Sequence, residues 1–92
     1  MNHYMKVRWL HEHADAPIVL LSELDEERYE IRKVEVFADG RMGYAFDDTE
    51  FGGTGLAGVP MPEAIDIAAD PQFIIEEITF AEFERYWENA TS

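Results

Sequence analysis

Two histidines close together in the sequence, His11 and His13, are the first residues whose types could do chemistry. Two residues apart on a strand, their imidazoles would share one face and could bind a metal ion. No cysteine and no second His–carboxylate motif accompanies them, and His3 is isolated. The stretch is more typical of a solvent-exposed loop ahead of Pro17, so we predict no metal site.

Oxygen-rich and glycine-rich residues follow one another from position 47 to position 58. Asp47, Asp48 and Glu50 could supply calcium ligands, but their spacing differs from that of the twelve-residue EF-hand loop. The stretch FGGTGLAG suggests a phosphate-binding loop, yet it lacks the Lys-Ser/Thr of a P-loop, and the neighbouring acids would repel phosphate. We therefore predict a solvated connection and no cofactor.

Catalytic side chains are difficult to assemble from this sequence. Cysteine is absent and all three histidines lie within the first 13 residues, so no Ser-His-Asp or Cys-His set is indicated. Carboxylate pairs such as Glu23 with Asp25 are expected by chance among 20 acids, whereas acid–base catalysis needs one desolvated carboxyl. The sequence favours a protein that is not an enzyme, with a carboxylate or metal enzyme as the third alternative.

The first half of the chain has the alternation of strands. Residues 4–11, 18–24, 32–38 and 41–46 each predict one strand, with 18–24 the more central because it is largely apolar. Asp39-Gly40 predicts a two-residue hairpin turn with positive φ at both positions. That register places Gly43 and Ala45 opposite two valines, where we expect a helix to pack closely.

The second half predicts helices after a long irregular connection at 47–60. Pro62 favours a short helix over 61–70, and residues 71–78 are expected to be extended. Thr79 and Glu82 form a capping-box pattern ahead of an apolar stripe, which predicts a helix over 80–90 with Phe83 and Trp87 on the sheet. Strands first and helices last predict one α+β domain, residues 1–92, with an antiparallel sheet of about four strands.

Charge is the unusual feature of the composition, with a net charge of −13. Residues 1–46 hold nine acids and six bases, while residues 47–92 hold eleven acids and one base. Nucleic acids and anionic membranes would be repelled, whereas a basic protein would be attracted; solubility alone is the other interpretation. No apolar run suits a signal peptide or a membrane span, so we expect a cytoplasmic protein.

The chain also resembles a known family along most of its length. The segments are MKVRW, then SELDEERYEIRKVEVFADG at 22–40, then GYA, and finally DPQF, EEIT and EFE with Trp87, together spanning residues 5–87. They resemble a family of small bacterial domains of unknown function, which implies no assigned activity. In size and charge such domains are similar to the immunity proteins encoded beside bacterial toxins, an analogy of class rather than of motif.

We therefore expect a binding protein, with an immunity-type inhibitor of a basic toxin domain as the leading hypothesis. The alternative is a structural or regulatory interaction module, such as a homodimer formed through an uncovered sheet face. Trp9 and Trp87 are expected in the core, and Tyr29 at the surface. The expected partner-binding residues occupy a charged turn and the glycine-rich loop: Glu23, Asp25, Glu26, Glu27, Tyr29, Glu30, Asp47, Asp48 and Glu50.

Overall fold

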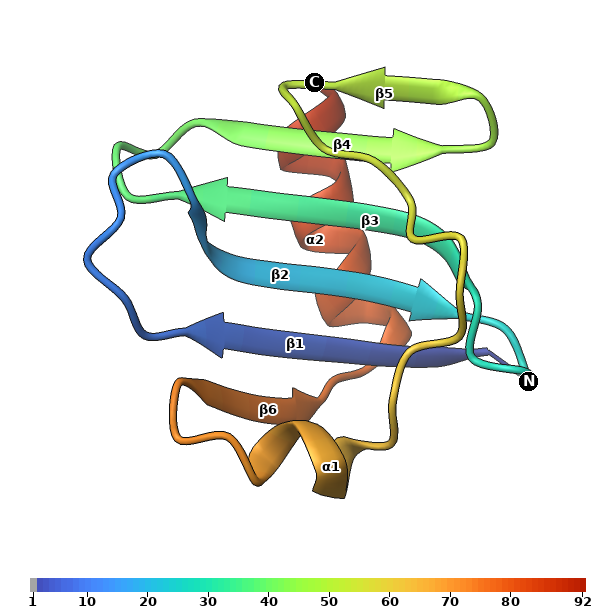
Figure 1. The fold of residues 1–92 in the computed structure, drawn as a ribbon. Helices are drawn as coiled ribbons and strands as arrows, with labels where there is room; N and C mark the ends of the chain where they lie inside the picture. Colours follow the sequence, from blue (N-terminus) through green and yellow to red (C-terminus); the bar gives the residue numbers. More distant parts are fainter. Residues whose placement is uncertain (1) are drawn as a thin grey trace.

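The computed structural model describes residues 2–92, which form a six-stranded antiparallel sheet and two helices (Figure 1). The strands lie across the sheet in the order β5-β4-β3-β2-β1-β6. The elements in chain order are β1 (His3–Trp9), β2 (Pro17–Leu24), β3 (Glu30–Phe37), β4 (Met42–Phe46), β5 (Thr49–Phe51), α1 (Ala64–Ala68), β6 (Phe73–Glu77) and α2 (Phe80–Thr91).

The two faces of the sheet are covered by different segments. Helix α2 crosses the far face in Figure 1, against β2, β3 and β4, and residues 52–63 cross the near face on their way from β5 to α1. The α+β class, the antiparallel sheet and the C-terminal helix are thus confirmed. The expected number of about four strands is wrong. Strand β5 has only three residues, all exposed, and the extended segment before α2 joins the sheet as β6, paired with β1.

The β3–β4 hairpin differs from the predicted one by a single residue. Phe37 N donates to Arg41 O at 2.9 Å, which closes a three-residue loop, and only Gly40 within it has positive φ, at 91°. Val34 therefore pairs with Tyr44 and Val36 with Met42, so the predicted pairing with Ala45 and Gly43 is wrong. A three-residue loop with glycine in the left-handed region is the next commonest hairpin solution.

That slip moves the small residues of β4 to the other face of the sheet. Gly43 and Ala45 pair with Glu35 and Lys33, on the face that residues 52–63 cross, and not beneath α2. A Cβ on Gly43 would collide with the Thr54 hydroxyl and lie 2.9 Å from the Phe51 carbonyl oxygen. Glycine is needed here because the crossing connection lies directly on the strand.

Helix α2 forms as its sequence predicted. The Thr79 side chain accepts a hydrogen bond from Glu82 N at 3.1 Å, and Phe83 is fully buried with Leu21 and Val34. Trp87 is half-buried at the margin of this core. Helix α1, in contrast, has only five residues and no side-chain cap. Neither helix in the described part of the chain is long and apolar enough to cross a membrane.

Candidate functional site

Two of the predicted acidic segments lie at the same end of the sheet. The β2–β3 turn and the β4–β5 turn both lie at the right-hand end in Figure 1, because alternate turns of an antiparallel meander fall at one end. Neighbouring strands are about 4.8 Å apart, so the two turns lie within about 10–15 Å of each other. The fold therefore brings together Asp25, Glu26 and Glu27 with Asp47 and Asp48. We call these five residues the acidic end.

The β2–β3 turn is held rigidly by its own first residue. Asp25 Oδ1 accepts hydrogen bonds from Glu27 N at 2.9 Å and Tyr29 N at 3.0 Å. The side chain of Asp25 thus builds the turn, as aspartate often does. Glu26 and Glu27 are exposed beside it, and Tyr29 is 40% exposed, in agreement with its expected surface position.

The cation of this turn points away from the acids. Arg28 adopts a left-handed backbone, with φ of 70°. Its guanidinium donates from Nε to Met61 O at 2.9 Å and from a terminal nitrogen to Pro62 O at 2.8 Å, and Met61 N donates back to Arg28 O. Arg28 therefore fastens the crossing connection to the turn, and its guanidinium also lies 3.8 Å from the carboxylate of Glu63.

The β4–β5 turn presents two carboxylates to solvent. Asp47 has a positive φ of 49°, which aspartate tolerates better than most residues, and both Asp47 and Asp48 are exposed. Glu50 is also exposed, but its carboxylate lies close to Gly55 on the face that residues 52–63 cross. Glu50 therefore borders the acidic end from one side of the sheet.

Glu23 is not available to a partner in the way the sequence suggested. It is 7% exposed and accepts from Arg32 Nε at 2.5 Å, from Tyr4 Oη at 2.9 Å and from Asn2 Nδ2 at 3.1 Å. Burial tends to raise the pKa of Glu23, but these hydrogen bonds outweigh it and hold the pKa below its ordinary value. Arg32 also binds Glu84 of α2 at 2.5 Å, so this network ties helix to sheet.

Glu30 is likewise buried, on the opposite face of the sheet. It is 9% exposed, accepts from Ser22 Oγ and from Ala57 N, and lies 3.6 Å from Lys33 Nζ. Lys33 lies between Glu30 and Glu35, whose carboxylate accepts from Thr54 at 2.7 Å. Glu23 and Glu30 must therefore be removed from the expected docking surface, because both serve internal ion pairs.

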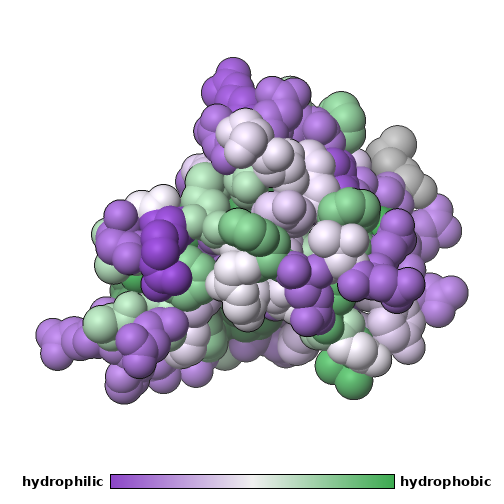
Figure 2. All heavy atoms as spheres, turned by 90° about the horizontal axis from the view of Figure 1, so that it is seen from above, coloured by the Kyte–Doolittle hydropathy of each residue, from purple (hydrophilic) through white to green (hydrophobic). Residues whose placement is uncertain are grey.

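An aromatic cluster beside the acidic end was not expected from the sequence. Tyr44 stacks on Phe51 at 5.2 Å between ring centroids, and Trp87 meets Tyr44 and Phe46 edge-on at 5.7 and 5.5 Å. Phe51 is 55% exposed on the edge strand β5. Figure 2, which looks down on this edge, shows apolar and pale surface in the middle with hydrophilic surface around it. We call these four residues the aromatic cluster.

The two histidines of the β1–β2 loop are engaged locally. His11 Nε2 lies 2.8 Å from Pro17 O, and its Nδ1 accepts from His13 N at 2.9 Å. Across residues 2–92, no group of three or more histidine, aspartate or glutamate side chains is arranged to hold a metal ion.

The comparisons with known proteins place the chain in one family. No curated protein and no solved structure matches the chain. A family model described as a domain of unknown function, DUF6881, matches residues 3–92, nearly the whole sequence. The chain therefore belongs to the DUF6881 family of domains of unknown function.

Proposed function

We propose that the protein binds a basic protein partner through the acidic end and the adjoining aromatic cluster. The leading form of this proposal is an immunity-type inhibitor, which covers a basic toxin domain by presenting carboxylates where the toxin would bind phosphates. The overall charge of −13 would draw such a partner in, and a fixed geometry at one end of the sheet would select it.

The observation that carries the proposal concerns three carboxylates of the acidic end, which no base among the described residues neutralises. Glu27, Asp47 and Asp48 take part in no ion pair among the described residues. The bases nearest to them in sequence have other partners. Arg28 binds the carbonyls of Met61 and Pro62 and pairs with Glu63, whereas Arg41 pairs with Asp39. The fold thus pairs these cations elsewhere and leaves Glu27, Asp47 and Asp48 exposed to solvent.

The aromatic cluster adds the kind of contact that acids alone cannot supply. Exposed carboxylates mainly raise the association rate, whereas buried aromatic side chains dominate the binding energy of protein interfaces. Phe51 and Trp87 could be covered by the partner, and arginine or lysine side chains could stack on their rings. This combination favours a basic protein over a small cation as the partner.

The experiment compares charge reversal at the two ends of the sheet. Glu27→Lys with Asp48→Lys changes the acidic end, and Glu12→Lys with Asp15→Lys changes the exposed β1–β2 loop at the other end by the same net charge. Each variant is tagged and used to capture partners from its native host, and the basic proteins retained are quantified by mass spectrometry.

We expect the acidic-end variant to lose the basic partner and the opposite-end variant to keep it. With the purified partner, the association rate should fall steeply between low and physiological salt, while the dissociation rate changes little. Equal losses from both variants would mean that bulk charge alone matters, and would remove the acidic end as a specific site.

An interaction module without a toxin partner is the second candidate. Its supporting observation is strand β5, a free sheet edge that carries the exposed Phe51. A homodimer would pair the β5 edge of one copy with the β5 edge of the other. Sedimentation equilibrium of the wild-type protein should then give a mass that rises with concentration. Phe51→Ser should abolish that rise. A constant monomer mass would exclude this alternative.

A further inference from the structure

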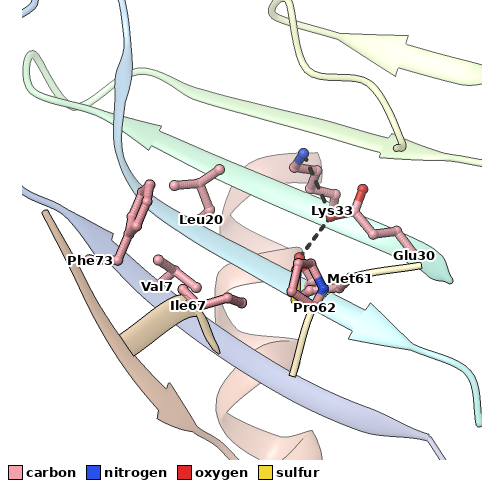
Figure 3. Close-up of a pocket in the computed structure, with 9 residues that line it drawn as sticks. Val7, Leu20, Glu30, Lys33, Met61, Pro62, Ile67 and Phe73 are labelled. Atoms are coloured by element: carbon pink, nitrogen blue, oxygen red, sulfur yellow. Dashed lines mark hydrogen bonds and ion pairs between the residues drawn. The ribbon is translucent and has the colours of Figure 1, made fainter. Parts of the chain in front are cut away.

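A pocket of about 220 Å³ lies on the sheet face opposite α2. Its floor is formed by Val7 of β1 and Leu20 of β2, and Phe73 of β6 and Ile67 of α1 close one side. Figure 3 shows these four apolar side chains gathered at one end of the pocket. The apolar part of the pocket is therefore built from four elements and is not a gap within a single loop.

The other end of the pocket is polar and almost fully paired. Glu30 and Lys33 lie there in Figure 3, and Ser22 Oγ donates to Glu30 at 3.1 Å. Lys33 is held loosely: its ammonium nitrogen lies 3.5 Å from Gly55 O and 3.6 and 3.9 Å from the carboxylates of Glu30 and Glu35. Strong hydrogen bonds to an ammonium group are about 2.7–2.9 Å long, so all three contacts of Lys33 are longer than a strong hydrogen bond.

The roof of the pocket is fixed by contacts outside it. Met61 and Pro62 line the pocket, and their carbonyl oxygens are the two that Arg28 binds. The roof is thus held at a defined height above the floor without filling the space beneath. A preformed space of this kind lowers the ordering cost of ligand binding.

We propose that this pocket binds a small uncharged molecule with an apolar body and one hydrogen-bond acceptor at its end. The apolar body would lie among Val7, Leu20, Ile67 and Phe73, and the acceptor would point to Lys33. A cavity of about 150 Å³ accommodates benzene, so 220 Å³ suits a molecule of about ten non-hydrogen atoms.

The charges around the polar end select against ionised ligands. Glu30, Glu35 and Lys33 together carry a formal charge of −1, which opposes a carboxylate. A cationic ligand would find both carboxylates already paired with Lys33 and hydrogen-bonded, and it would lose its hydration in an apolar space. A carbonyl or hydroxyl oxygen meets neither penalty. The pocket is separate from the proposed partner surface, since none of its lining residues belongs to the acidic end or to the aromatic cluster.

The test uses three probes of similar size: acetophenone, phenylacetate and benzylamine. Each is titrated into the full-length protein with ¹³C-labelled methyl groups, and the shifts of Val7, Leu20 and Ile67 methyls are followed by NMR. We expect acetophenone to bind with a Kd on the order of 1 mM or tighter, and at least about threefold more tightly than either charged probe. Nuclear Overhauser effects should connect its ring protons with the Val7 and Leu20 methyls.

Two variants of the same helix supply the control. Ile67→Phe places extra volume in the pocket and should weaken acetophenone binding at least about tenfold. Ile65→Phe changes a side chain that is 79% exposed and should leave the Kd within about twofold of wild type. The inference is overturned if acetophenone leaves the pocket methyls unshifted, if a charged probe binds as tightly, or if the two variants bind equally. The probe ranking and the Overhauser contacts decide the matter on wild-type protein should Ile67→Phe fail to fold.

Discussion

Replacing Arg32 by methionine tests whether the buried ion network holds α2 on the sheet. The guanidinium binds Glu23 and Glu84 and lies 4.8 Å from the Phe83 ring centroid and 4.9 Å from that of Trp87. Methionine keeps an apolar stem over those rings but removes the charge. The variant therefore isolates the ion pairs from the packing.

The expected cost follows from what each carboxylate loses. Glu23 is 7% exposed, so without Arg32 it stays buried and keeps only Tyr4 and Asn2 as donors. Breaking one side of a buried pair costs about 3–5 kcal/mol. The Glu84 side chain is 26% exposed and can turn to solvent, so it adds little. A domain of this size has a free energy of unfolding of about 5–15 kcal/mol, so Arg32→Met should remove a large part of it.

Arg41→Met is the matched control, because Arg41 makes the same kinds of contact at the surface. Its guanidinium pairs with Asp39 at 2.8 Å and lies 4.7 Å from the Phe37 ring, but both charged side chains are about 60% exposed. Such exposed pairs contribute about 0–1 kcal/mol. Urea unfolding at pH 7 should therefore give a cost for Arg32→Met at least about 2 kcal/mol above that for Arg41→Met.

The same pair of variants should differ in pH dependence. The pKa of Glu23 is lowered in the folded protein, so its contribution to stability is present above its unfolded pKa and is lost as pH falls through the folded pKa. Without Arg32, the effect of burial on Glu23 is opposed only by the hydrogen bonds from Asn2 and Tyr4, so the pKa of Glu23 should rise. The gap between wild type and Arg32→Met should then narrow as the pH is lowered from 7 to about 4. An equal cost for the two arginine variants, or a gap independent of pH, would refute the reasoning.

Three further substitutions, two of them with a control variant, test the fold with urea unfolding. Gly43→Ala should cost about 1–3 kcal/mol because its Cβ collides with Thr54, whereas Gly58→Ala meets open space and should cost less than about 1; similar costs would refute the close approach. Gly40→Val should cost about 1 kcal/mol or more, because a β-branched residue is strained at φ of 91°, and an unchanged unfolding midpoint would contradict it. Phe83→Ala should cost about 3–5 kcal/mol and Phe80→Ala, 56% exposed, less than about 1; the reverse order would place the core elsewhere.

Helix α2 and the longer strands could be predicted because the sequence patterns that specify them involve residues close together in the chain. Thr79 caps its helix through Glu82, three residues on, and the Phe83–Trp87 spacing needs only the helical period. Strand β5 lacks such a signal, since three residues are too few to establish alternation. It exists because Thr49 and Phe51 pair with residues of β4.

The hairpin register depended on a contact that the sequence does not display. Asp39-Gly40 fits a two-residue and a three-residue loop equally well by local rules. The structure adopts the longer loop, which puts Gly43 beneath Thr54, more than ten residues later in the chain. Tertiary packing thus decides between two locally acceptable turns, and every side chain of β4 changes face as a result.

Exposed and buried acids in the charged segment 22–40 could not be distinguished from the sequence for the same reason. Glu23 and Glu27 are chemically identical in the sequence, yet Glu23 lies opposite Arg32 across β2 and β3. Once the register is known, the cross-strand pair marks Glu23 as structural. Glu27, in the turn, has no strand opposite it. The candidate partner surface therefore becomes smaller than expected from the sequence and gains the aromatic cluster.

Arg28 connects the two proposed sites physically. Its backbone belongs to the acidic turn, while its guanidinium holds the carbonyls of Met61 and Pro62 in the pocket roof. A partner that moves the turn would therefore change the height of the roof. Binding free energies at two coupled sites are reciprocal, so a ligand in the pocket would alter partner affinity by the same factor. Arg28→Ala removes the side-chain link and leaves only the backbone hydrogen bond from Met61 N to Arg28 O, so any coupling between ligand and partner should weaken in that variant even where each still binds.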